Sequence, residues 1–269
     1  MLRAERYQQI VDFVNKKGIV ALEDLMEEVR ISKATARRDI NDLSAQNLLI
    51  KIRGGAKSCN VEATSAEPSF VAKSLVNSEE KQRIALAALE YIHDGDKLML
   101  DSGTTVLELA KLLKSKSHLT VVTNDIRIAA ELQDIPDLSL LLIGGMIRKG
   151  FCSSYGFFAE TMLGNITVSK LFFSVDAIDP EMGLKSYTMD DLNIKKIGIA
   201  NASERILLCD HSKFQSRAMF SIAGLDAIDT IIVGNELEES IAQKLSHMGK
   251  KLLLVLASCV MMRLLMVPS

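Results

Sequence analysis

The sequence predicts an α/β protein in two parts: a small helical N-terminal domain, and a larger C-terminal domain built on a mostly parallel sheet. Two observations lead to this division. The first 57 residues carry apolar residues at helical spacing and end in a β-like segment, whereas after residue 78 short apolar runs alternate with helical stretches. Strands that alternate with helices form βαβ units, whose parallel sheets are covered on both faces.

The N-terminal domain, residues 1–57, is expected to hold three helices and a hairpin. Gly18 should end the first helix, and Ser32 is a favourable N-cap for the third. Residues 48–53 alternate like a strand and meet a Gly-Gly turn. The apolar stripes of the three helices are Ile10, Val11 and Val14, then Leu22, Leu25, Met26 and Val29, then Ile40 and Leu43.

The third helix is basic on its solvent side. Residues 30–57 hold seven Lys or Arg against two Asp, a net charge of +5 in a chain whose total is −2. A tight break before a basic helix predicts a helix-turn-helix over residues 20–41, with a hairpin wing beside it, and therefore binding to double-stranded DNA. Asp39 is expected to buttress an arginine. The residues expected to contact DNA are Ser32, Lys33, Thr35, Arg37 and Arg38 on the helix, and Lys51, Arg53, Gly54 and Gly55 in the wing.

A linker is expected over residues 58–78, followed by the larger domain over residues 79–256. The linker mixes small polar residues with Pro68 and shows no sustained period. A helix over residues 79–92 should open the larger domain. Its strands are predicted at residues 97–101, 119–123, 138–143, 171–176, 205–210, 230–233 and 251–256.

Polar loops follow five of these strands, where ligands of open α/β sheets bind. At the first, a small polar loop leads into a helix that opens near Thr104, so free N–H groups and the helix dipole favour a phosphate there. Each loop taken singly is commonly a cap or a turn, but five together favour a binding site. The loop residues are Asp101, Ser102, Gly103, Thr104 and Thr105, then Thr123 and Asn124, then Gly144 and Gly145, then Asp176, then Asp210 with Lys213.

Several classes of site are disfavoured. The loop at residues 101–105 matches neither of the glycine-rich patterns of ATP and NAD sites, so no cofactor is expected. The four cysteines and four histidines are scattered without metal-ligand spacing, so no metal is expected, and the cysteine usage fits the reducing cytoplasm. The apolar run 252–267 is interrupted by Arg263 and is shorter than the ~20 residues of a membrane span. Residues 257–269 form an atypical tail with no expected role.

The chain resembles the DeoR family of transcriptional regulators over residues 3–256. In the N-terminal domain the resemblance rests on residues 32–40 and on Arg53-Gly54-Gly55-Ala56. In the larger domain it rests on residues 101–105, 121–124, 144–145, 156, 175–179 and 210–214.

The resemblance implies a larger domain related to ribose-5-phosphate isomerase and an effector that is a sugar phosphate. It adds Lys195 or Lys196 to the effector-binding residues. The sequence departs from the family pattern at Asp190-Asp191, at Ala177, and at Tyr155 and Phe157-Phe158, whose bulk around Gly156 is unusual. These departures bear on which effector binds.

The resulting hypothesis is a homo-oligomeric repressor of a carbohydrate-utilisation operon that a phosphorylated sugar or sugar alcohol releases from its operator. No catalytic residue and no membrane association is expected. The alternative is an isomerase-like enzyme with an accessory DNA-binding domain, in which Asp176 and Asp179 act as general acid and base. Paired aspartates near a strand end are, however, commonly caps or turn formers.

Overall fold

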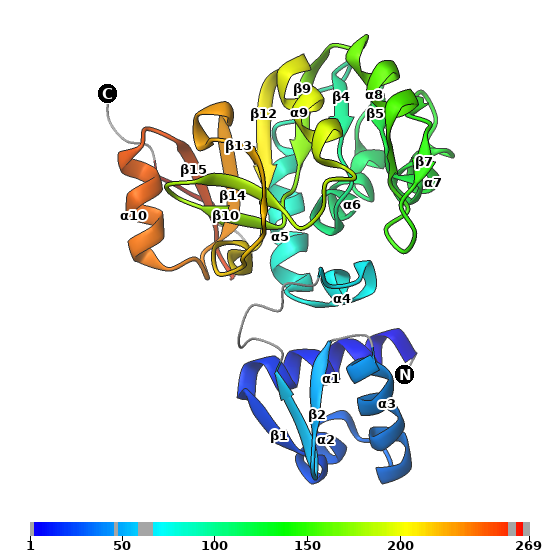
Figure 1. Ribbon diagram of the computed structural model, residues 1–269, viewed down its shortest axis with the longest axis vertical. Coiled ribbons are helices and arrows are strands. Elements are labelled where there is room, and N and C mark those ends of the chain that lie inside the picture. The colour runs from blue at the N-terminus through cyan, green and yellow to red at the C-terminus, as the bar shows by residue number, and fades with distance from the viewer. Residues whose placement is uncertain (1–2, 46–47, 59–66, 258–261, 266–269) are drawn as a thin grey trace. The chain divides into compact units, whose positions relative to one another are not determined.

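The computed structural model describes residues 3–45, 48–58, 67–257 and 262–265. Contacts between its Cα atoms divide the chain into two compact units, Met1–Ser78 and Glu79–Ser269. Figure 1 shows the elements of each unit. Across the described residues, no helix combines the length and the apolar character that a membrane crossing requires.

The first unit contains the three predicted helices and the predicted hairpin. Its two hairpin strands pair antiparallel, and a further strand, β1, pairs with the second of them to make a three-stranded sheet. The sequence did not reveal β1 because it has only three residues. The elements are α1 (Arg3–Lys17), β1 (Ile19–Ala21), α2 (Leu22–Val29), α3 (Lys33–Ala45), β2 (Leu49–Ile52), β3 (Gly55–Ser58) and α4 (Phe70–Leu75).

Helix α4 lies inside the range expected to be a linker. The Ser69 hydroxyl caps it by accepting a hydrogen bond from the N–H of Ala72 at 3.1 Å. Ala72 is buried in the same apolar core as α1 to α3, and the Gln8 side chain donates to the carbonyl of Leu75. Residues 69–76 therefore belong to the first unit, because burial and capping hold a segment that has no sequence period. Residues 59–66 of the predicted linker lie outside the described residues.

The second unit is built on an eight-stranded sheet in the order β16-β15-β14-β12-β9-β4-β5-β6. Seven strands run parallel, and all seven were predicted to within three residues at each end. They are β4 (Lys97–Leu100), β5 (Thr120–Thr123), β6 (Ser139–Leu142), β9 (Val168–Phe173), β12 (Ala202–Leu208), β14 (Thr230–Gly234) and β15 (Lys251–Val255).

Helices cover both faces of this sheet, as the continuous apolar strands predict. On β4, Met99 faces one apolar core, whereas its neighbours Leu98 and Leu100 face the other. The first core includes α8 (Phe157–Gly164), α9 (Leu192–Asn201) and α10 (Glu239–His247). The second includes α5 (Ser78–Leu89), α6 (Thr104–Ala110) and α7 (Ile126–Leu132).

Two small sheets and several short helices were not predicted. Their strands have two to four residues, too few to show a period. They are the pair β7 (Met146–Ile147) and β8 (Ser154–Tyr155), and the trio β10 (Ala177–Asp179), β11 (Gly183–Ser186) and β13 (Phe220–Ala223). The short 3-10 helices are η1 (Leu113–Ser115), η2 (His211–Phe214) and η3 (Leu225–Ala227).

The C-terminal tail, which had no expected role, contains a strand. Strand β16 (Met262–Leu265) pairs antiparallel with β15, with Leu253 opposite Leu264. The tail thus extends the parallel sheet by one antiparallel edge strand. Residues 258–261 and 266–269 lie outside the described residues.

Helix α3 is anchored from behind by a buried ion pair. Asp39 is 1% exposed, and its Oδ2 accepts a hydrogen bond from Arg6 Nε of α1 at 2.6 Å. Asp39 therefore buttresses an arginine, as the sequence suggested, and that arginine is Arg6. Because the pair joins α1 to the inner side of α3, it fixes the rotation of α3 about its own axis.

We predict that Asp39→Ala destabilises the first unit by about 2 kcal/mol, because the Arg6 guanidinium loses its buried acceptor. Hydrogen–deuterium exchange of α1 and α3 amides in the full chain would measure the loss. The control is Asp24→Ala, which changes an exposed carboxylate of α2. Equal exchange protection in the two variants would contradict the anchoring role.

Candidate functional site

Helices α2 and α3 form the predicted helix-turn-helix. Arg30 ends α2 with a left-handed backbone (φ 53°), and Ser32 opens α3 by accepting a hydrogen bond from the N–H of Thr35 at 3.2 Å. The two hydroxyls of Ser32 and Thr35 also lie 2.9 Å apart. Both residues are thus engaged at the start of α3, where a phosphate could still reach their hydroxyls.

The solvent side of α3 presents exposed cations. Arg37 and Arg38 are exposed, and neither forms an ion pair with any residue that the structure describes. Lys33 is held loosely, 3.6 Å from Glu23, with both side chains exposed. Free guanidinium groups on one face of a recognition helix can pair with guanine or with phosphate.

The wing places its two glycines differently. Lys51, Arg53 and Gly54 are exposed, and Gly54 adopts φ +86°, which the tight turn requires. Gly55 is buried, and a Cβ there would lie 2.0 Å from the carbonyl oxygen of Val20. Gly55 thus lets β1 approach β3, while the tip at Arg53 and Gly54 is open to a DNA backbone.

In the second unit, the carboxyl ends of the parallel strands hold a buried ion pair. Lys195 of α9 donates to Asp101 Oδ2 at 2.5 Å and to the carbonyl of Ser174 at 2.9 Å, and both charged side chains are under 5% exposed. Asp191 lies 4.0 Å from the same ammonium. Burial raises the pKa of Asp101 to about 6 against the opposing ammonium. Burial lowers the pKa of Lys195, but its carboxylate neighbours outweigh this and raise it overall, so the pair is ionised at neutral pH.

Two acceptor atoms beside this pair lack partners. Asp101 Oδ1 and Asn124 Oδ1 are buried and accept no hydrogen bond from any described residue. Asn124 donates through Nδ2 to the carbonyl of Ser154, so its amide is held in place while its oxygen is left open. Buried acceptors without donors are costly, and a ligand with hydroxyl groups would supply the missing donors.

The neighbouring loop is tightly hydrogen-bonded. Thr123 donates to the carbonyl of Leu100 at 2.7 Å, and Ser102 donates to Asp125 Oδ2 at 2.8 Å. Asp125 also caps α7, and burial raises its pKa. These hydrogen bonds hold the loops that follow β4 and β5 together at the carboxyl edge of the sheet.

Asp176, which follows β9, is also hydrogen-bonded at this edge of the sheet. Its Oδ2 accepts from the hydroxyl of Ser186 at 3.2 Å and from the N–H of Tyr187 at 3.0 Å. Asp176 therefore orders the loop that leads to Asp191 and α9. The same loop carries Asp190, which pairs with Arg148 at 3.6 Å.

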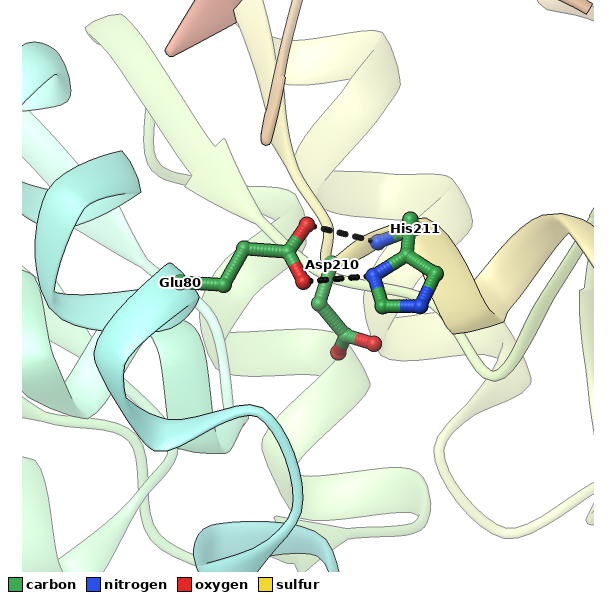
Figure 2. Close-up of side chains that lie close together, drawn as sticks. All are labelled: Glu80, Asp210 and His211. Atoms are coloured by element: carbon green, nitrogen blue, oxygen red, sulfur yellow. Dashed lines mark hydrogen bonds and ion pairs between the residues drawn. The ribbon is translucent and has the colours of Figure 1, made fainter. Parts of the chain in front are cut away.

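A second buried cluster follows β12. Glu80 of α5 accepts a hydrogen bond from the N–H of His211 at 2.8 Å, and its Oε2 lies 2.7 Å from His211 Nδ1 (Figure 2). Glu80 also accepts a hydrogen bond from the N–H of Gly234 at 3.2 Å. Lys81 lies 4.0 Å from Asp210, and burial lowers the pKa of Lys81 to about 8. Glu80 thus clamps the first turn of α5 onto the ends of β12 and β14.

The cluster of Glu80, Asp210 and His211 suits hydrogen bonding better than metal binding. Ligand atoms of Glu80, Asp210 and His211 lie within 4.8 Å of one another, as a metal site requires. Both oxygens of Glu80 already face donors of His211, and the ammonium of Lys81 is close to Asp210. A cation would displace these bonds and meet the charge of Lys81, so the cluster fits a structural role.

Comparison with known proteins identifies both units. A model of the DeoR-like helix-turn-helix domain matches residues 6–62, and one of the DeoR C terminal sensor domain matches residues 76–235. The chain is 33% identical to a putative aga operon transcriptional repressor of Escherichia coli O157:H7, over 94% of each chain. It is 31% identical to the glycerol-3-phosphate regulon repressor of Escherichia coli K12, over 86% of this chain and 90% of that one.

The chain belongs to the DeoR family. It is a DNA-binding transcriptional regulator rather than an enzyme, so the isomerase alternative is set aside. About half of the chain (51%) superposes on 55% of ribose 5-phosphate isomerase A from Methanocaldococcus jannaschii, with 17% identity and a TM-score of 0.38. That partial likeness transfers no activity to this DeoR-family chain.

The structure buries seven of the residues proposed for the sensor site. Asp101, Thr105, Thr123, Asn124, Asp176 and Lys195 are buried, and so is Asp210, which belongs to the cluster of Glu80 and Lys81. Lys196 and Gly144 are exposed, and Gly145 lies against the backbone of α8. Of the two lysines that the DeoR resemblance left open, the structure places Lys195 in the buried pair and Lys196 on the surface. The remaining proposed residues, Ser102, Gly103, Thr104 and Lys213, are half-buried.

Sequence reasoning missed Glu80, Lys81, Asp125 and Asp191 of the sensor domain. Glu80 and Lys81 stand in the first turn of a helix, where charged residues are usual, and their partners His211 and Asp210 are far away in the sequence, 131 positions in the case of Glu80 and His211. Asp125 follows the predicted loop directly and resembles an ordinary helix cap. Asp191 precedes Lys195 by one helical turn, which is the available signal for that pair.

The Glu80 clamp leads to a pH prediction. Its hydrogen bond raises the pKa of His211 above the ordinary 6.5. The pair therefore stabilises the fold fully below about pH 6.5, and this stabilisation is lost as the pH rises through the pKa of the folded state. The thermal midpoint of the wild type should exceed that of His211→Gln by most at acidic pH, with the excess shrinking as the pH rises. A difference independent of pH, or one matched by exposed His93→Gln, would contradict this.

Proposed function

We propose that the protein represses a carbohydrate-utilisation operon in the cytoplasm and leaves its operator when a phosphorylated sugar or sugar alcohol binds the sensor domain. The observation that carries the proposal is the buried Lys195–Asp101 pair with open acceptors beside it, in a chain whose α3 presents unpaired arginines. The names of relatives, an aga operon repressor and a glycerol-3-phosphate regulon repressor, support this class of target.

The open acceptors favour a polyol end of the effector. Asp101 Oδ1 and Asn124 Oδ1 both need donors, and sugar hydroxyls donate. A phosphate at the same place would be repelled by Asp101, Asp176 and Asp191. The hydroxyl end of the ligand is therefore assigned to this pair of acceptors.

The phosphate end is assigned toward Lys213. Lys213 is half-buried in η2 and forms no ion pair among the residues that the structure describes, so its charge is available. Strand β9 separates β12 from β4, which puts their ends about 10 Å apart. A phosphorylated monosaccharide can span that distance between Lys213 and Asp101.

Two copies are proposed to act together on DNA. One winged helix covers a short site, and regulators of this architecture gain affinity and specificity from paired half-sites. The proposed partners are therefore double-stranded operator DNA, the phosphorylated effector and a second copy of the chain.

One test of this proposal concerns DNA binding. Arg37→Ala or Arg38→Ala should weaken operator binding by about 1–3 kcal/mol, because each removes an unpaired guanidinium from α3. Fluorescence anisotropy at fixed salt, on a genomic fragment selected by the wild-type protein, measures the loss. Arg217→Ala, an exposed arginine of the sensor domain, is the matched control. Wild-type affinity in both α3 variants would exclude the recognition role.

The second prediction concerns the effector. Asp101→Asn should keep operator affinity and lose about 10-fold or more in sensitivity to whichever of glycerol 3-phosphate, ribose 5-phosphate and fructose 6-phosphate releases the wild type. Asp96→Asn is the control, since Asp96 pairs with Lys170 at 2.5 Å at the opposite end of β4. Equal responses of the two variants would place the effector elsewhere.

A further inference from the structure

The bulky residues around Gly156 that depart from the family pattern lie on an apolar surface of the sensor domain. Phe157 and Phe158 open α8 and are 76% and 74% exposed, with their rings edge to face at 5.6 Å. Met146 of β7 is 63% exposed. We call the β6–α8 surface the set Leu141, Met146, Ile147, Phe157 and Phe158, all of which are exposed. Leu142 is exposed as well but lies on the opposite face of β6.

These residues come from elements that contact one another. Strand β7 pairs with β8, with Met146 opposite Tyr155. Gly145, which links β6 to β7, lies against the carbonyl of Tyr155 and the backbone of Ala159 in α8. The end of β6, the β7–β8 pair and the first turn of α8 therefore form one continuous surface, at the end of the sensor domain where Figure 1 labels β7 and α8.

Strand β6 is a sheet edge, and no strand among the described residues pairs with its outer side. It is the last strand of the eight-stranded sheet. The N–H groups of Ser139 and Ile143 bond to β5, so the alternating Leu140 and Leu142 direct their backbone groups outward. Edges of this kind are normally guarded by charges, proline or a covering element. Residues 138–147 contain no charge and no proline.

We propose that the β6–α8 surface is where two copies of this chain pair about a two-fold axis, with β6 antiparallel to its counterpart. The outward groups of an edge strand match another strand, and an uncharged edge matches itself. The flanks are complementary in charge: exposed Asp134 and Asp137 precede β6, and exposed Lys149 follows the surface. Antiparallel pairing brings the acidic flank of one copy beside the basic flank of the other.

The acidic residues before β6 favour a second copy of the chain over a lipid surface or a nucleic acid as the partner. A lipid surface with anionic headgroups or a nucleic acid would be repelled by Asp134 and Asp137 and would find no cation on β6. The paired half-sites of the proposed function call for two copies, and to that extent the inference rests on it. The surface itself is argued from the edge, the aromatic residues and the flanking charges.

A charge-complementation experiment on Leu141 tests the pairing. Leu141 lies next to the centre of β6, so its two copies face each other close to the axis. In Leu141→Glu or Leu141→Lys like charges meet, and each variant alone should show a dimer dissociation constant raised by at least about 100-fold. An equimolar mixture of the two should recover association as a mixed dimer, because opposite charges then meet. Sedimentation velocity of the full chain at micromolar concentration, without DNA, measures this.

Two further variants make the outcome decisive. Met248→Glu places the same charge at the C-cap of α10, where Met248 is 49% exposed, and should associate like the wild type. Phe157→Ser with Phe158→Ser should weaken association by about 10-fold or more, because aromatic residues anchor interfaces. Circular dichroism should show wild-type secondary structure in every variant.

A monomeric wild type would overturn the pairing, as would wild-type association of both Leu141 variants or a mixture that stays monomeric. These results are independent of the proposed function, because association is measured without DNA. A chain that pairs through β6 but binds no operator would refute the repressor proposal and leave the interface standing. A monomer that binds operator with full affinity would refute the interface and leave the repressor proposal standing.

Discussion

The ion pair between Lys195 and Asp101 organises the sensor domain, because it joins helix α9 to the end of β4, an interior strand of the sheet. The carbonyl of Ser174, which follows β9, accepts a second hydrogen bond from the Lys195 ammonium. One side chain of α9 therefore contacts the ends of both β4 and β9, which are distant in sequence. Breaking such a buried pair leaves a charge without compensation, which costs several kcal/mol. This contact fixes Asp101 and its open acceptor against α9 and the end of β9.

How far the sequence predicts the fold depends on the length of each element. Strands such as β9 and β14 are apolar along their length because both faces are covered, and they were found. Strands β1, β8 and β11 are short, and tertiary pairing rather than local pattern determines them. Helix α4 shows the same limit, since it is stabilised by a cap at Ser69 and by burial of Ala72 in a core built mostly from distant residues.

Some residues of the candidate site could be predicted from the sequence, and others could not. Residues at strand ends, such as Asp101, Thr123 and Asp210, follow from the rule that parallel strands end at one edge of the sheet. The choice of Lys195 over Lys196 was open at first, yet the apolar stripe of Ile194, Gly198 and Ile199 shares its face with Lys195. Glu80 could not be predicted in this way, because its clamp on His211 depends on how α5 lies across the sheet.

The anchoring of α3 through Asp39 and Arg6 separates two jobs that one helix must do. Its orientation is set on the buried side, and its exposed positions 33, 37 and 38 carry only loose contacts or none with the described chain. Substitutions at independent sites have nearly additive effects, so the exposed positions can change with little cost to stability. Such a helix can diverge toward new operator sequences one residue at a time, while the scaffold that presents it stays the same.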